Sequence, residues 1–134
     1  MVARGELAPP TSGWVSLRQR GADDWLVPRV RCCAAFFCKL RGLSFRRRLA
    51  AGEGLLFVDR YESRVATAIH MLFMFFPIGV LWLDAGGRVV DTCLARPWRL
   101  IYAPRGPARY VLETSPAVLD AVQPGDTLEW VALD

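Results

Sequence analysis

The sequence has one histidine, one lysine and no long hydrophobic run, and each of these scarcities limits what the chain can do. His70 is the only imidazole available as a catalytic base or a metal ligand. The longest uncharged stretch runs from Met71 to Leu83 and is interrupted by Pro77 and Gly79. A membrane-spanning helix needs roughly 20 apolar residues. We therefore expect no transmembrane segment.

The first ten residues also lack the continuous apolar core of a secretory signal, because Arg4 and Glu6 interrupt them and prolines follow. We therefore expect a cytoplasmic protein, with peripheral association with a membrane as the alternative. Cysteines stay reduced in the cytosol. On that basis we expect four free, mostly buried thiols, at Cys32, Cys33, Cys38 and Cys93.

Patterns typical of metal and nucleotide sites are missing as well. Cys32 and Cys33 are adjacent, which does not match the ligand spacing of zinc sites. The Gly52-Glu53-Gly54 turn lacks the later glycine and the lysine of a phosphate-binding loop. A lone histidine in an apolar run is more often a hydrogen-bonded structural residue than a catalyst. We expect no metal, no cofactor and no catalysis, with an enzyme that uses His70 as an alternative.

Positive charge is concentrated in the first half of the chain. The net charge is +4, and residues 29–48 contain no acidic residue. This segment interleaves Phe36, Phe37 and Phe45 with seven basic residues, namely Arg29, Arg31, Lys39, Arg41, Arg46, Arg47 and Arg48. Such a segment attracts phosphates of nucleic acids or of anionic lipids, although a solvated charged face is the ordinary alternative. The predicted anion-binding residues are Arg41, Arg46, Arg47 and Arg48.

Local patterns predict a mainly β fold. Residues 80–83 and 88–90 flank Asp84-Ala85-Gly86-Gly87, a combination typical of a β-hairpin. Further strands are predicted at residues 55–58, 110–112 and 127–133, with two more before and after a bend at Pro77, from residue 68 onward. Short helices are predicted within residues 30–48, broken at Gly42, and at residues 115–122. Residues 1–28 are expected to be an irregular arm with a strand near residues 14–17, and residues 29–134 a single domain.

Nine short motifs follow one another along the chain in a characteristic order. They are Arg-Gly-Leu at 41–43, Gly-Glu-Gly-Leu-Leu-Phe at 52–57, Ile-His-Met-Leu-Phe-Met at 69–74, Pro-Ile at 77–78, Leu-Asp at 83–84, Gly-Arg-Val-Val at 87–90, Pro-Trp-Arg at 97–99, Ala-Arg-Tyr-Val-Leu-Glu at 108–113 and Pro-Gly-Asp at 124–126. Their order resembles the family of uncharacterised proteins named domain of unknown function 192, a family of prokaryotic type. The resemblance covers about residues 30–130. It implies a single-domain β-sandwich or partly open barrel with one or two short helices, and it implies no known activity, substrate or cofactor.

Two positions depart from the family pattern. The family commonly has a basic or polar residue where Phe75 stands, and an aspartate where Gly79 stands. Loss of both charged residues together is physically reasonable, because removing only one partner of a buried ion pair leaves the other charge buried without compensation. Any polar site that the family builds around this pair is in doubt here.

The leading hypothesis for function is a non-catalytic domain that binds a small ligand or a protein. Its predicted ligand-binding residues are His70 and, in the proline-rich loop at residues 96–107, Arg96, Trp98 and Arg99. The alternative is binding of a polyanion, either nucleic acid or an anionic membrane surface, through residues 29–48.

Overall fold

A computed structural model describes residues 8–133 of the chain, apart from the side chains of Phe36 and Phe37. Seven strands and two short helices occur in this part. In chain order they are β1 (Trp14–Gln19), β2 (Val27–Cys33), α1 (Phe36–Arg41), β3 (Glu53–Ser63), β4 (Ile78–Leu83), β5 (Val89–Ala95), β6 (Ala108–Thr114), α2 (Val118–Ala121) and β7 (Leu128–Ala132). Within residues 8–133, no helix is long and apolar enough to cross a membrane.

All seven strands belong to one mixed sheet in the order β5-β4-β6-β3-β2-β1-β7, in which only β2 and β3 pair in parallel. The edge strands β5 and β7 approach each other at one end only. There, Val89 N donates to Asp126 O (2.8 Å) and Leu128 N donates to Gly87 O (2.9 Å). The sheet is therefore curled but not closed. The predicted mainly β fold with short helices is confirmed, in its partly open form and not as a two-sheet sandwich.

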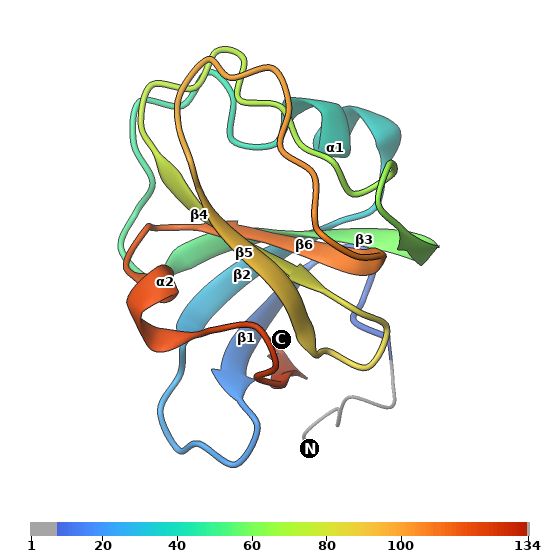
Figure 1. The fold of residues 1–134 in the computed structure, drawn as a ribbon. Helices are drawn as coiled ribbons and strands as arrows, with labels where there is room; N and C mark the ends of the chain where they lie inside the picture. Colours follow the sequence, from blue (N-terminus) through green and yellow to red (C-terminus); the bar gives the residue numbers. More distant parts are fainter. Residues whose placement is uncertain (1–7, 134) are drawn as a thin grey trace.

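The sheet has a hydrophobic core on each face. Side chains alternate along a strand, so Leu56, Leu81 and Leu112 enter one core while Val80 and Val111 enter the other. All six residues of β4 are buried, which requires cover on both sides. Figure 1 shows α2 and the curled β1–β2 end of the sheet on one side, and α1 with three long loops on the other.

Several predicted elements are confirmed. Strands β4 and β5 form the predicted hairpin, and the Asp84 carboxylate accepts hydrogen bonds from Gly86 N (3.0 Å) and Arg88 N (2.9 Å) in its turn. Gly87 has a φ of +85°, a conformation that glycine adopts without strain. The segments predicted at 55–58, 110–112 and 127–133 lie in β3, β6 and β7, and the one near residues 14–17 is β1.

Within residues 8–28 the strands extend beyond the one predicted near residues 14–17, because β1 continues to Gln19 and β2 begins at Val27. Strand β1 pairs with β2 on one side and β7 on the other. The register of β1 and β2 shifts between Val15 and Leu17, a place where a sheet accommodates a proline such as Pro28. There, Ser16 Oγ donates to Pro28 O (2.5 Å). The prolines and glycines of this segment therefore mark a bulge and turns between strands.

Two further predictions from local pattern are wrong. Residues 30–33 are strand and not helix, because they pair in parallel with β3, and the helix is confined to α1. Residues 68–76 do not form a strand before Pro77. They form a loop, and the isolated bridge between Ile69 and Tyr102 joins this loop to the loop at residues 96–107 and not to the sheet. Ile69, Met71 and Met74 of this loop are buried and cover one face of the sheet instead of pairing within it.

Gly79 sits where no side chain fits. A Cβ built at this position would lie 2.7 Å from Val118 Cγ1 and 2.8 Å from Ser115 O. The space that an aspartate would need is filled by the start of α2. The glycine thus allows α2 to pack closely on β4.

We expect Gly79→Ala to lower the free energy of unfolding by about 1–3 kcal/mol, because the added methyl group overpacks this contact. Gly106→Ala is the matched control, since nothing lies within 4 Å of a Cβ there. It should change stability by less than about 0.5 kcal/mol. Denaturant unfolding measures both, and equal stability of the two variants would contradict the close packing of α2.

Candidate functional site

Three long loops meet at one end of the molecule. They are residues 42–52, 64–77 and 96–107, which appear together at the top of Figure 1. Their backbones are joined directly: Phe45 N donates to Phe73 O (2.9 Å), and Trp98 N donates to Met71 O (2.8 Å). Ser44 Oγ also donates to Leu72 O (2.7 Å). The three loops therefore form one continuous surface.

Exposed aromatic side chains gather on this surface. Phe45, Phe73, Phe75 and Trp98 are 59%, 44%, 57% and 51% exposed, and we call these four residues the aromatic crest. The Phe45 and Phe73 rings stack with centroids 4.6 Å apart, and the Trp98 ring meets Phe73 edge-on at 5.3 Å. Leu100, on the same loop as Trp98, is 73% exposed. Contiguous exposed apolar groups of this kind mark interaction surfaces.

The backbone of the crest is strained. Phe45, Phe73 and Trp98 have φ values of 68°, 59° and 69°, and they are the only non-glycine residues with positive φ among residues 8–133. Such a conformation costs a bulky residue on the order of 1–3 kcal/mol. The three residues with positive φ are three of the four exposed aromatic residues of the crest, so the backbone strain is concentrated where the aromatic side chains face solvent.

The crest is surrounded by positive charge and no negative charge. Residues 30–52, 63–83 and 92–112, which contain the three loops, hold six, one and four basic residues and no acidic residue. Arg47, Arg48, Arg96 and Arg99 are exposed on these loops. The end of the molecule that displays the rings is therefore cationic.

The structure divides the predicted anion-binding segment. Arg31, Arg41 and Arg46 line one hollow of about 330 Å³, whereas Arg47 and Arg48 project from the following loop. Arg29 does not line this hollow, and its guanidinium lies 4.6 Å from the centre of the Trp14 ring. Of the predicted aromatic partners, Phe45 belongs to the crest, and the side chains of Phe36 and Phe37 lie outside the described part of the structure.

The predicted ligand-binding residues come from two loops that lie side by side, but their side chains do not converge. His70 Nε2 lies 2.6 Å from Leu40 O, while Leu72 N donates to its Nδ1 (3.2 Å). Because Nδ1 accepts, Nε2 is the nitrogen that carries the proton. Trp98 is part of the crest, and Arg96 and Arg99 are exposed beside it. A hollow of about 490 Å³ adjoins the crest, with Phe45, His70 and Phe73 in its wall.

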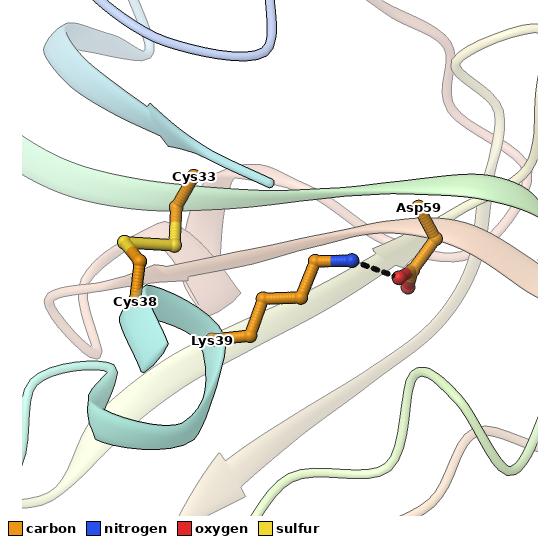
Figure 2. The surroundings of a disulfide bond; sticks show 4 residues. All are labelled: Cys33, Cys38, Lys39 and Asp59. Carbon is orange, nitrogen blue, oxygen red and sulfur yellow. Dashed lines mark hydrogen bonds and ion pairs between the residues drawn. A yellow bond between two sulfur atoms is a disulfide. The ribbon is translucent and has the colours of Figure 1, made fainter. Parts of the chain in front are cut away.

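Helix α1 is fixed to the sheet by a disulfide between Cys33 and Cys38, whose Cα atoms are 5.9 Å apart (Figure 2). The prediction of four free thiols is therefore wrong. Neighbouring strand residues point to opposite faces, so Cys33 at the end of β2 faces α1 while Cys32 enters the other core. The separation of the two Cα atoms lies within the range found for disulfides.

The next residue of the helix makes a second tie. Figure 2 shows Lys39 reaching from α1 to Asp59 on β3, where the two side chains form an ion pair. Both side chains are largely buried. Losing one partner of such a pair leaves the other charge uncompensated. The pair thus holds α1 against the outer face of β3.

Beneath α1 lies a cavity of about 60 Å³ with Glu113 in its wall. Glu113 is 4% exposed, and no hydrogen bond or ion pair from the described residues reaches its carboxylate. Burial raises the pKa of Glu113 from 4.5 to about 8. This group was missed in the sequence because its place in the 108–113 motif identifies a strand and not a cavity.

The remaining nucleophile candidates are inert. Burial raises the pKa of Cys32 to about 11. Burial, and then the charges of Asp91 and Glu113, raise the pKa of Cys93 to about 12. Within residues 8–133, no three of the histidine, cysteine and acidic side chains come together as metal ligands would.

Known proteins are similar to this chain in sequence and in fold. The model of the DUF192 family, described as uncharacterised, matches residues 16–130. A UPF0127 protein of Thermococcus sibiricus is 38% identical over 104 residues, which are 76% of this chain and 66% of that relative. One from Pyrococcus horikoshii is 36% identical over 103 residues, 75% of this chain and 86% of that relative.

Two crystal structures have the same fold. A candidate transcription regulator from Sinorhizobium meliloti aligns with a TM-score of 0.77 at 24% identity, over 93% of this chain and 99% of its own. A protein of unknown function from Novosphingobium aromaticivorans aligns with a TM-score of 0.69 at 21% identity, over 92% and 91%. At this level of identity the likeness concerns the fold alone.

The raised pKa of Glu113 predicts a specific loss of stability with pH. Between pH 4.5 and 8 the folded state keeps the proton that the unfolded state releases, so the free energy of unfolding falls by about 1.4 kcal/mol per pH unit and levels off above pH 8. Glu113→Gln should remove this slope and be the more stable protein at pH 8. Glu129→Gln, a buried glutamate that pairs with Arg18, should keep it. Denaturant unfolding across this pH range measures the slope, and an unchanged slope in Glu113→Gln would refute the assignment.

The Cys33–Cys38 disulfide determines how many free thiols the chain should contain before and after reduction. Titration of unfolded protein that has not been reduced should find two thiols per chain, and four after reduction. A Cys33→Ala/Cys38→Ala variant should give two in both cases. Four thiols in the unfolded, unreduced protein would contradict the pairing.

Proposed function

The chain belongs to the DUF192 family of uncharacterised proteins, and we propose that it is a non-catalytic binding domain that docks on anionic lipid surfaces through the aromatic crest. The observation that carries this proposal is the combination of strained, exposed rings with arginines in three loops that contain no acidic residue. Aromatic and aliphatic groups enter the boundary between lipid headgroups and chains, while arginines contact the phosphates.

The aliphatic residues beside the crest favour lipid over nucleic acid. Leu100 and Ile101 are 73% and 67% exposed and offer nothing to a nucleotide base except contact area. Single-stranded nucleic acids bind through bases stacked on free aromatic faces. In the crest, Phe45 and Phe73 already stack on each other, which occupies one face of each ring. An apolar boundary layer has no such requirement.

The state of the potential catalytic groups supports a role in binding. Both ring nitrogens of His70 are engaged by backbone groups. The free thiols of Cys32 and Cys93 have pKa values raised to about 11 and about 12, so neither is a thiolate at neutral pH. Catalysis by the histidine or by a cysteine nucleophile would need one of these groups to be available.

Binding to phospholipid vesicles tests the proposal. We expect sedimentation with vesicles that contain phosphatidylglycerol, no sedimentation with pure phosphatidylcholine, and weaker binding as salt is added. Trp98→Ser should weaken binding by about 10- to 150-fold, because burying a large apolar side chain contributes roughly 1.5–3 kcal/mol. Arg47→Gln/Arg48→Gln should weaken it about thirtyfold, at roughly 1 kcal/mol for each arginine.

Matched variants away from the crest separate this site from general charge and hydrophobicity. Trp25→Ser removes a tryptophan that is 42% exposed near the other end of the sheet, and Arg20→Gln/Arg88→Gln removes the same charge from distant turns. Both should bind vesicles nearly as well as the native chain. Equal losses in crest and control variants, or a preference for single-stranded DNA over vesicles, would overturn the proposal.

A further inference from the structure

The cavity beneath α1 admits only a small group. One water needs roughly 10–15 Å³ of such space, so about 60 Å³ holds a few heavy atoms and no sugar or nucleotide. Phe57, Met74 and Val111 form an apolar part of its wall, and Glu113 supplies a carboxylate. A Cβ at Gly42 would lie 3.3 Å from Glu113 Oε1, so the glycine at the end of α1 leaves this oxygen uncrowded.

The Arg41 side chain lies exposed at the edge of the cavity and makes no hydrogen bond or ion pair with the described residues, whereas the polar side chains deeper in the wall have partners. Lys39 pairs with Asp59, and His70 Nε2 donates to Leu40 O (2.6 Å). The hydroxyls are committed too, since Ser44 Oγ donates to Leu72 O (2.7 Å) and Thr67 Oγ1 donates to Ser63 O (2.5 Å). Among the buried groups of the wall, the Glu113 carboxylate is left without a partner from the described residues. A ligand that completes the cavity must therefore bring hydrogen-bond donors.

We propose that this cavity binds a small primary ammonium group, with the Glu113 carboxylate as its counter-ion. An ammonium group brings three donors and a positive charge in a compact volume. A buried carboxylate without a partner is unfavourable, and a cation that donates to it removes that penalty. The cavity shares His70 and Ser44 with the hollow beside the aromatic crest, but none of the crest rings lines it, and the proposal does not depend on lipid binding.

The charges around Glu113 are compatible with a cation. From α1, Lys39 is neutralised by Asp59 of β3, and Arg41 is exposed at the edge of the cavity. The 64–77 loop contributes His70, whose nitrogens are both engaged. Across the sheet, Arg31 on β2 lies beyond Leu55 and is exposed. On β5, the thiol of Cys93 lies beyond Val80, and its pKa of about 12 keeps it uncharged.

Calorimetric titration of the full chain with methylammonium chloride tests the proposal. We expect saturable binding, together with a higher melting temperature, because a ligand that binds only the folded state stabilises it. With a pKa of about 8, about one in ten Glu113 side chains is ionised at pH 7. Affinity should therefore be about tenfold higher at pH 9 than at pH 7, and binding at pH 7 should release close to one proton, which titration in buffers of different ionisation enthalpy detects.

Three comparisons decide the outcome. Tetramethylammonium carries the same charge without N–H donors and should not bind, nor should sodium at the same ionic strength. Glu113→Gln should lose methylammonium binding and keep its vesicle binding, whereas Glu129→Gln should keep both. Absence of saturable binding by the native chain, the same response to all three cations, or native affinity in Glu113→Gln would each overturn the proposal, whatever the vesicle experiment shows.

Discussion

Strand β4 is buried along its whole length on both faces, and the cover that it needs determines how the rest of the chain is arranged. The curl of the sheet encloses one face, where Leu81 and Leu83 pack with residues of β1 and β7. The other face cannot be covered by the sheet itself. Helix α1 and the three long loops cover it, which is why segments distant in sequence meet at one end of the molecule.

A cover made of a six-residue helix and loops has little internal stability, because short helices are marginal without tertiary contacts. The structure supplies those contacts at three consecutive residues of α1, from Cys38 to Leu40. The Cys33–Cys38 disulfide and the Lys39–Asp59 ion pair fasten it to β2 and β3, and Leu40 O accepts from His70 of the neighbouring loop. Glu113 lies where this cover meets the sheet, which explains how a strand carboxylate becomes buried without a partner.

The same arrangement explains the strain of the aromatic crest. Loops that lie over an apolar face would be most stable with their rings turned inward, yet Phe45, Phe73 and Trp98 hold theirs outward at positive φ. Hydrogen bonds between the loop backbones over-determine this conformation. The cost is compatible with a domain that has two well-packed cores, and it is concentrated where a binding surface is proposed.

The sequence by itself determined the elements whose signals are local. The β4–β5 hairpin follows from Asp84 to Gly87, and the strands at residues 55–58 and 110–112 follow from short apolar runs, because turn chemistry and β-propensity act over a few residues. The exclusively basic character of residues 29–48 was equally readable. The apolar residues 68–76 were misassigned, since apolar composition indicates burial without indicating whether the burial is in a strand or in a loop above one.

Only the tertiary structure decided which side chains meet. Pairing of Cys33 with Cys38 depends on which of two adjacent strand residues faces α1. The isolation of Glu113 depends on the buried donors of α1 and of the loops at residues 42–52 and 64–77 being committed elsewhere. The convergence of Phe45, Phe73 and Trp98 likewise requires three loops, more than 50 residues apart at the extremes, to be brought to one end. Such contacts arise from the packing of the whole sheet, and no local pattern in the chain encodes them.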